Sequence, residues 1–215
     1  MNLSLSHVDR LLQPARLQES DTVAPRVRMI VLAIVVYTFC YGLAMGSSNG
    51  RPLQMLYSGM KLPMLIFATC LICQPVFFMA NTLAGLRNDF REATRAIWTS
   101  QAVVAITLAS LTPLALFWYI SFDSYRFAVL MNAFMMTIAT VGGQIKLWSA
   151  YRQLIARNRK HRIMVWVWLL CYAFVGIQMG WLLRPFIGSP GVDTTFFRPE
   201  AFSNAYVVVF HLIFG

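Results

Sequence analysis

The sequence predicts an all-α protein of the membrane class, a polytopic helical bundle with five transmembrane helices and a short candidate sixth. Three observations predict this fold class. Apolar residues make up 58% of the 215 residues and charged residues only 12%, which is the composition of a membrane domain. The apolar residues gather in runs of roughly 17 to 24, long enough to cross about 30 Å of hydrocarbon. The Lys and Arg residues fall almost entirely between these runs.

The predicted spans follow one another with short gaps and leave no room for a separate soluble domain. They cover residues 28–46, 62–85, 96–120, 127–148, 163–183 and, as the shorter sixth candidate, 199–215. Residues 1–27 precede the membrane domain of residues 28–215. Weak helical periodicity interrupted by Pro14 predicts a short helix on the membrane surface in this N-terminal segment, with a mobile tail as the alternative.

The basic residues divide unevenly between alternate gaps. The N-terminal segment and the regions around the gaps after the second and fourth spans hold 13 Lys and Arg residues, against five elsewhere. The positive-inside rule therefore places the N-terminus in the cytoplasm, and we expect a bacterial inner membrane. Anionic lipids are the expected partners of the cytoplasmic face. A nucleic-acid partner is not expected, because the net charge of +10 comes from residues that flank the spans.

Three proline positions shape the predicted second and third helices. Pro63 lies near the start of the second helix, and Pro75 lies at its middle beside Gln74, where a kink is expected. The third helix contains Pro113 and ends in aromatic residues suited to the outer headgroup layer. Before the second span, helical spacing over residues 51–60 predicts a short interfacial helix.

The predicted membrane cores contain no Asp, Glu, Lys or Arg, which are the usual signs of an ion path or an intramembrane active site. No catalytic motif is present, so we expect no enzyme, no catalytic residue, no metal and no cofactor. Cys70 and Cys73 form a C-x-x-C pair that we interpret as small buried side chains rather than a redox or metal site. His211, on the candidate sixth helix, is predicted to be structural.

Amide side chains are the main polar groups within the predicted spans. They seek hydrogen-bond partners across helices, so they either join helices or line a polar cavity for a headgroup or small solute. The candidate polar interior consists of Gln74, Asn81, Gln101, Asn132, Gln144 and Gln178.

Two small-residue motifs predict close helix packing. Gly42 and Gly46 lie four residues apart in the first span, and Gly176 and Gly180 do so in the fifth. Because both pairs lie near the outer ends of helices that run in the same direction, we expect these two helices to touch there.

The segment from residue 181 to 198 is too apolar for a solvated loop. We expect its four large apolar residues, Phe186, Ile187, Phe196 and Phe197, to fold onto the 51–60 helix or into the outer leaflet. Arg51, Arg184 and Arg198 would then lie near one another as a candidate recognition surface for a phosphate headgroup or an acidic partner. The alternative is an interfacial anchor with locally paired charges.

Two stretches, Leu56–Pro63 and Gly180–Pro190, resemble segments of uncharacterised bacterial polytopic inner-membrane proteins. In size and helix count the chain also resembles the Yip-type family of five-helix membrane proteins, which are linked to trafficking factors. The resemblance implies an architecture and carries no functional residues across.

The expected function is that of a non-enzymatic scaffold or accessory subunit of a larger membrane assembly, with a membrane protein partner or a second copy of the chain. The alternative is transport or binding of a lipid or a small neutral solute. The absence of intramembrane charge favours the first interpretation, and the amides favour the second.

Overall fold

The computed structural model describes residues 23–122, 124–188 and 194–197, and within them the chain is a bundle of five long helices without strands. These are α2 (Val23–Gly46), α3 (Pro52–Leu83), α4 (Phe90–Ser121), α5 (Tyr125–Arg157) and α6 (Lys160–Leu183), joined in places by the short 3₁₀ turns η1 (Ser47–Asn49) and η2 (Arg87–Asp89). The predicted all-α class is confirmed. The surface helix expected within residues 1–27, and the candidate span 199–215, lie outside the described residues apart from the start of α2.

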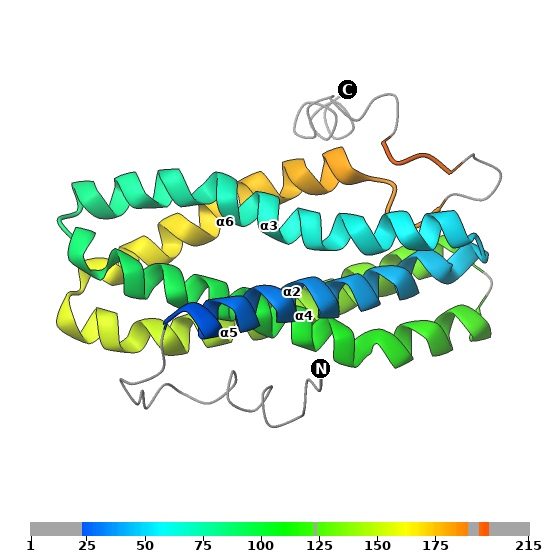
Figure 1. Ribbon diagram of the computed structural model, residues 1–215, viewed down its shortest axis with the longest axis horizontal. Coiled ribbons are helices and arrows are strands. Elements are labelled where there is room, and N and C mark those ends of the chain that lie inside the picture. The colour runs from blue at the N-terminus through cyan, green and yellow to red at the C-terminus, as the bar shows by residue number, and fades with distance from the viewer. Residues whose placement is uncertain (1–22, 123, 189–193, 198–215) are drawn as a thin grey trace.

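Consecutive helices run antiparallel along the long axis of the molecule (Figure 1). Helix α2 packs against α3 and α4, α3 also packs against α6, and α4 packs against α5. All five helices are long and apolar enough to cross a membrane. This combination is that of an integral membrane protein.

Two helices extend well beyond the spans predicted from hydropathy. Helix α3 begins at Pro52, a residue suited to the first helical turn, and absorbs the interfacial helix expected over residues 51–60. Helix α5 continues through Arg157, about two and a half turns past the predicted end of the span at residue 148; an extension of this helix through residue 155 is predicted from the sequence and is confirmed. Hydropathy marks only the part of a helix that suits hydrocarbon, whereas backbone hydrogen bonding continues through the polar turns at the interface.

The buried residues form two clusters along the bundle. One contains residues of all five helices, including Ile34 of α2, Phe77 of α3, Ile97 of α4, Tyr151 of α5 and Trp168 of α6. The other lies nearer the opposite end and is built by α2 to α5 together with Ile187, which follows α6. Helix α6 therefore leaves the core toward its C-terminal end. Figure 1 shows α5 and α6 diverging from the turn that joins them.

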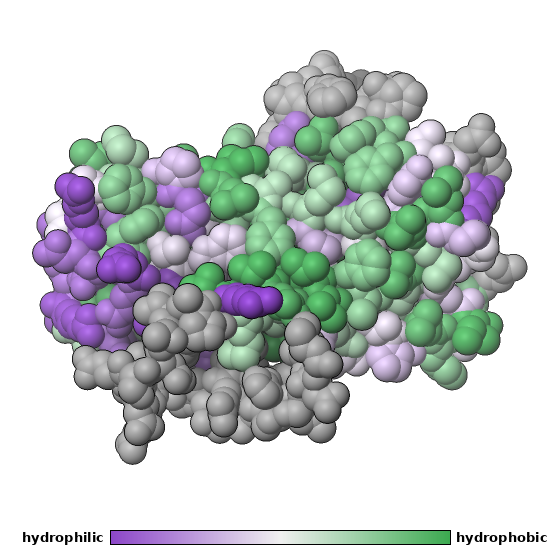
Figure 2. Space-filling model, viewed as in Figure 1, coloured by the Kyte–Doolittle hydropathy of each residue, from purple (hydrophilic) through white to green (hydrophobic). Residues whose placement is uncertain are grey.

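Polar residues gather at one end of the bundle. We call this the basic end; it carries the turns at residues 84–89 and 157–160 and the exposed side chains of Arg87, Arg91, Arg95, Arg152, Arg159 and Arg162. Figure 2 shows hydrophilic surface collected there and a mostly hydrophobic band along the rest of the visible face. This separation of charge from apolar surface fits a bundle that crosses hydrocarbon.

The predicted packing of the two glycine motifs against each other is wrong. A Cβ added at Gly42 would lie 2.5 Å from the Ser58 carbonyl oxygen, and one at Gly46 would lie 2.7 Å from Met55 Cα, so both glycines face α3. A Cβ at Gly176 would meet Thr69, also on α3, at 3.7 Å, and one at Gly180 would meet no described atom within 4 Å. We expected α2 and α6 to pack against each other at these glycines, but each of them packs against α3 instead.

Candidate functional site

Three of the predicted interior amides join helices by hydrogen bonds, and the contacts of Asn132 and Gln101 are the shortest. Asn132 of α5 accepts a hydrogen bond at Oδ1 from Tyr41 Oη of α2 (2.9 Å), and its Nδ2 donates to Tyr119 Oη of α4. Gln101 Oε1 of α4 accepts from Tyr172 Oη of α6 at 2.9 Å. These contacts favour the interpretation of the amides as links between helices.

The interior amides do not form one chamber. Asn81 Nδ2 donates to the Phe77 carbonyl of its own helix (2.8 Å), and Gln74 Oε1 accepts from Thr94 Oγ1 of α4 (3.5 Å). Gln178 is half-buried on α6. Asn81 Oδ1 and Gln74 Nε2 are buried and have no hydrogen-bond partner among the described residues. Among the described residues, these side chains therefore do not form a continuous amide-lined passage.

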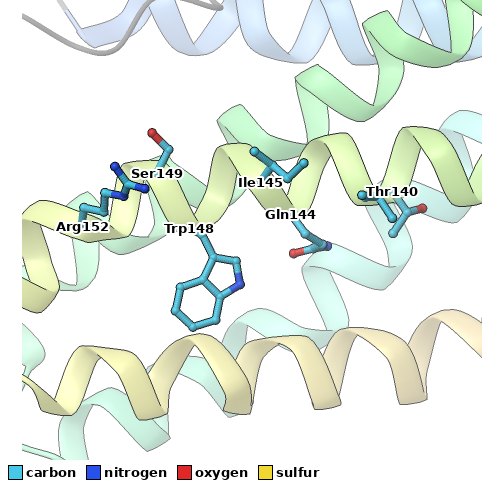
Figure 3. Close-up of a pocket in the computed structure, with 7 residues that line it drawn as sticks. Thr140, Gln144, Ile145, Trp148, Ser149 and Arg152 are labelled. Carbon is cyan, nitrogen blue, oxygen red and sulfur yellow. The ribbon is translucent and has the colours of Figure 1, made fainter.

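The sixth amide, Gln144, lies in a groove on the side of the bundle. The groove has a volume of about 560 Å³. Seven residues from successive turns of α5 line it: Thr140, Val141, Gln144, Ile145, Trp148, Ser149 and Arg152. In Figure 3 the side chains of Gln144 and Trp148 point toward α6, and the Trp148 ring packs edge-on against Trp166 of α6 at 5.9 Å. The groove thus lies along α5 alone, and Gln144 and Trp148 form its side toward α6.

The lining of the groove changes along its length from a charged residue to a mixture of apolar and neutral polar residues. Arg152 and Ser149 lie nearest the basic end, Trp148 follows, and Ile145, Gln144, Val141 and Thr140 lie deeper. The Gln144 Oε1 atom is buried without a hydrogen-bond partner among the described residues. From Arg152 to Thr140 the helix rises roughly 18 Å at 1.5 Å per residue. One leaflet contributes about 15 Å of hydrocarbon, so the groove has the length of one leaflet.

At the opposite end, the segment after α6 folds back onto α3, as predicted for Phe186, Ile187 and Phe196. Gln54 Nε2 donates to the Phe186 carbonyl (3.0 Å), Ser58 Oγ donates to the same carbonyl, and Lys61 Nζ donates to the Pro185 carbonyl (2.8 Å). Ile187 joins the second core cluster. The Phe196 ring packs against Tyr57 at 5.2 Å and lies 4.9 Å from Lys61 Nζ.

The three side chains that donate hydrogen bonds to the Pro185 and Phe186 carbonyls were not predicted as site residues, although their spacing in the sequence indicates a shared helix face. Gln54, Ser58 and Lys61 are fully buried and spaced by four and three residues, so they share one face of α3. Lys61 was expected in a gap between spans; it lies within α3 because the helix begins at Pro52. The helix predicted over residues 51–60 left Lys61 outside, so the three residues were not recognised as one face of a continuous helix.

The predicted arginine surface is described only in part. The Arg184 guanidinium stacks on the Trp181 ring with 3.2 Å between its Cζ and the ring centroid, and Arg51 precedes α3 directly. Arg198 lies outside the described residues. The gathering of all three arginines therefore stays a prediction.

Charged side chains at the basic end tie three helices together. Arg157 of α5 pairs with Glu92 of α4 at 2.7 Å, and the fully buried His161 of α6 lies with Nε2 3.1 Å from Asp89 Oδ2. Lys160 Nζ donates to the Ala84 carbonyl at 3.1 Å. We had not expected this cluster, because Asp89 and His161 are 72 residues apart in the chain.

Comparison of the chain with protein-family models, curated proteins and solved structures gave no match. The resemblance to Yip-type and uncharacterised bacterial membrane proteins stays a prediction. Among the described residues, no group of three His, Cys, Asp or Glu side chains is placed to hold a metal ion.

Proposed function

We propose that this protein binds an anionic lipid in the lateral groove of α5, as a non-enzymatic component of the membrane. The observation that carries the proposal is the arrangement of the groove: Arg152 lies at the basic end, and the apolar side chains of Trp148, Ile145 and Val141 line it over roughly the next 6 to 17 Å along the helix, beside Gln144 and Thr140. A guanidinium at headgroup level suits a lipid phosphate, and apolar residues beneath it suit an acyl chain. By the positive-inside rule, the leaflet at the basic end is the cytoplasmic one.

The size of the groove is that of a small-ligand site, enough for one acyl chain beneath a headgroup. The groove holds about 560 Å³, within the range of roughly 300–1,000 Å³ typical of small-molecule sites. The scaffold or accessory-subunit function expected from the sequence remains a prediction.

Lateral binding is also better supported than passage of a solute through the interior. Asn132 and Gln101 use their amides to hold neighbouring helices together, and core side chains such as Tyr41, Met135 and Trp168 are fully buried between them. The groove lies outside this core on one helix. A ligand there would enter from the bilayer.

Native mass spectrometry can test the proposal on protein taken from vesicles of equal phosphatidylglycerol and phosphatidylethanolamine. We expect the wild type to retain phosphatidylglycerol preferentially. Arg152→Gln should lower this preference about fivefold, since a basic residue near the surface contributes about 1 kcal/mol toward anionic lipid. Arg91→Gln, which removes an exposed charge of α4 at the same end, is the matched control.

A second pair of variants tests the chain-binding part of the groove. Ile145→Trp should fill the groove and reduce retention of both lipids, whereas Leu71→Trp, at an exposed apolar position on α3, should not. Equal lipid retention by all variants would rule out the groove as the binding site. Recovery of a protein chain in place of lipid, lost in Ile145→Trp, would favour the scaffold function.

A further inference from the structure

Several buried polar atoms in the half of the bundle nearest the basic end have no hydrogen-bond partner among the described residues, and four of them belong to side chains that are fully buried. These four are Asn81 Oδ1 of α3, Tyr151 Oη of α5, and His161 Nδ1 and Trp168 Nε1 of α6. All four residues have an exposed fraction of 0%. Buried polar groups in folded proteins are nearly always hydrogen-bonded to protein or to ordered water, so four such atoms in one region call for a ligand.

The contacts between helices place these residues along one line. Phe77 packs against Trp168 with 5.4 Å between ring centroids, and Thr69 lies nearest Gly176, so α3 and α6 run antiparallel with Phe77 level with Trp168. Asn81, one turn further along α3, is then level with a point on α6 between Trp168 and His161. These two residues are seven positions apart, roughly 10 Å along the axis and on one face of the helix.

Tyr151 completes the line at the basic end. Its ring lies 6.3 Å from the ring of His161, centroid to centroid. His161 Nε2 in turn faces Asp89 Oδ2 at 3.1 Å, and the Asp89 side chain is 30% exposed. The line of polar atoms therefore begins next to a carboxylate that reaches the surface.

The chemistry of the four atoms identifies the ligand class. The Trp168 indole can only donate a hydrogen bond, the Asn81 oxygen can only accept one, and the Tyr151 hydroxyl can do both. His161 Nε2 faces the Asp89 carboxylate, so its Nδ1 accepts a hydrogen bond if the ring is neutral and donates one if the ring is protonated. Neither a cation nor an anion satisfies donors and acceptors together, whereas water does.

We propose that Asn81, Tyr151, His161 and Trp168 form an internal hydration site in which ordered water enters from Asp89 and reaches about 10 Å into the bundle. This site is separate from the groove, because none of these four residues lines it. Water in this site would contact the buried imidazole of His161. Among the described residues, the ring nitrogen atoms of His161 make one hydrogen bond, between Nε2 and Asp89.

Nuclear magnetic resonance of ¹⁵N-tryptophan-labelled protein in lipid nanodiscs tests the proposal directly. We expect a water cross-peak at the indole N–H of Trp168, assigned by its loss in Trp168→Phe. Asn81→Leu should weaken this cross-peak, because it removes a neighbouring ligand of the water and leaves the Trp168 contacts with Phe77 and Tyr172 in place. Absence of the cross-peak in the wild type would overturn the proposal.

Thermal unfolding is an independent test, because a hydrated site and a dry site predict different changes in Tm when the Tyr151 hydroxyl is removed. If water binds the Tyr151 hydroxyl, Tyr151→Phe should lower the Tm by about 2 to 6 °C; if the hydroxyl is buried dry, its removal should leave the Tm unchanged or raise it. Tyr172→Phe, which removes a hydroxyl bonded to Gln101, lowers the Tm in either case and shows that the assay is sensitive. A Tm of Tyr151→Phe at or above the wild-type value would overturn the proposal.

Discussion

Replacement of Gly42 by alanine should separate α2 from α3 and destabilise the bundle, although alanine is the better helix former. The added Cβ would lie 2.5 Å from the Ser58 carbonyl oxygen and 2.8 Å from Gly59 Cα, where ordinary contact begins at 3.4 Å. The helices would have to part by about 0.9 Å, and the opposing atoms belong to the backbone, so no flexible side chain can move away.

The expected magnitude follows from two opposing effects. Glycine to alanine in a helix favours folding by about 0.5–1 kcal/mol, whereas overpacking in a close-packed interior costs about 1–3 kcal/mol. Because the clash is with backbone atoms of α3 that no rotamer change can move, we expect a net loss of about 1–2 kcal/mol. For a chain of this size, this corresponds to a fall in Tm of roughly 2 to 8 °C.

Gly180→Ala is the matched control, because its Cβ would meet no described atom within 4 Å. The control should keep or slightly raise the Tm, since only the helix propensity changes. The assay is thermal unfolding in detergent, with membrane insertion checked for each variant. If Gly42→Ala were as stable as the wild type, or if both variants lost the same stability, the assigned α2–α3 contact would be wrong.

Three further predictions concern the segment after α6, the register of α3 against α6, and the orientation. Lys61→Met should speed amide hydrogen exchange at residues 186–188 by about 10- to 100-fold, because the hydrogen bond from the buried ammonium group to the Pro185 carbonyl is lost. Met60→Ala, which changes the exposed neighbouring side chain, is the control and should leave the exchange rate unchanged. Oxidation with copper phenanthroline should join Cys73 of α3 to Cys171 of α6, because the Phe77–Trp168 and Thr69–Gly176 contacts place these two cysteines at the same level; Cys40 on α2 should stay free. A mass spectrum without the Cys73–Cys171 link would refute the register. In intact cells an impermeant thiol reagent should label Ser124→Cys and spare Asn158→Cys, and the reverse pattern would contradict the orientation.

The five helices could be predicted from the sequence because hydrocarbon imposes one requirement on every span. A run such as residues 163–183 must be apolar and about 30 Å long wherever it packs, so hydropathy alone finds it. The same reasoning underestimated α3 and α5, because their polar turns, including Lys61 and Arg152, satisfy no hydropathy criterion although they are helical.

The partners of each side chain could not be predicted, because they depend on how the helices are arranged. The motif of Gly42 and Gly46 shows that some backbone approaches closely, but the identity of that backbone depends on the position of α3. The pairing of His161 with Asp89 likewise requires the turns after α3 and α5 to meet at one end. Gln144 and Asn132 read alike in the sequence, yet one lines the groove and the other bonds to two tyrosines.

Photo-crosslinking from inside the groove tests the central claim of lipid binding most directly. A photoreactive amino acid would replace Ile145, or Leu71 as the control on the exposed face of α3, in protein held in vesicles of equal phosphatidylglycerol and phosphatidylethanolamine. The account predicts that the Ile145 position captures phosphatidylglycerol in clear excess over the Leu71 position. Equal yields and equal lipid proportions at the two positions, or a protein adduct at Ile145, would contradict it.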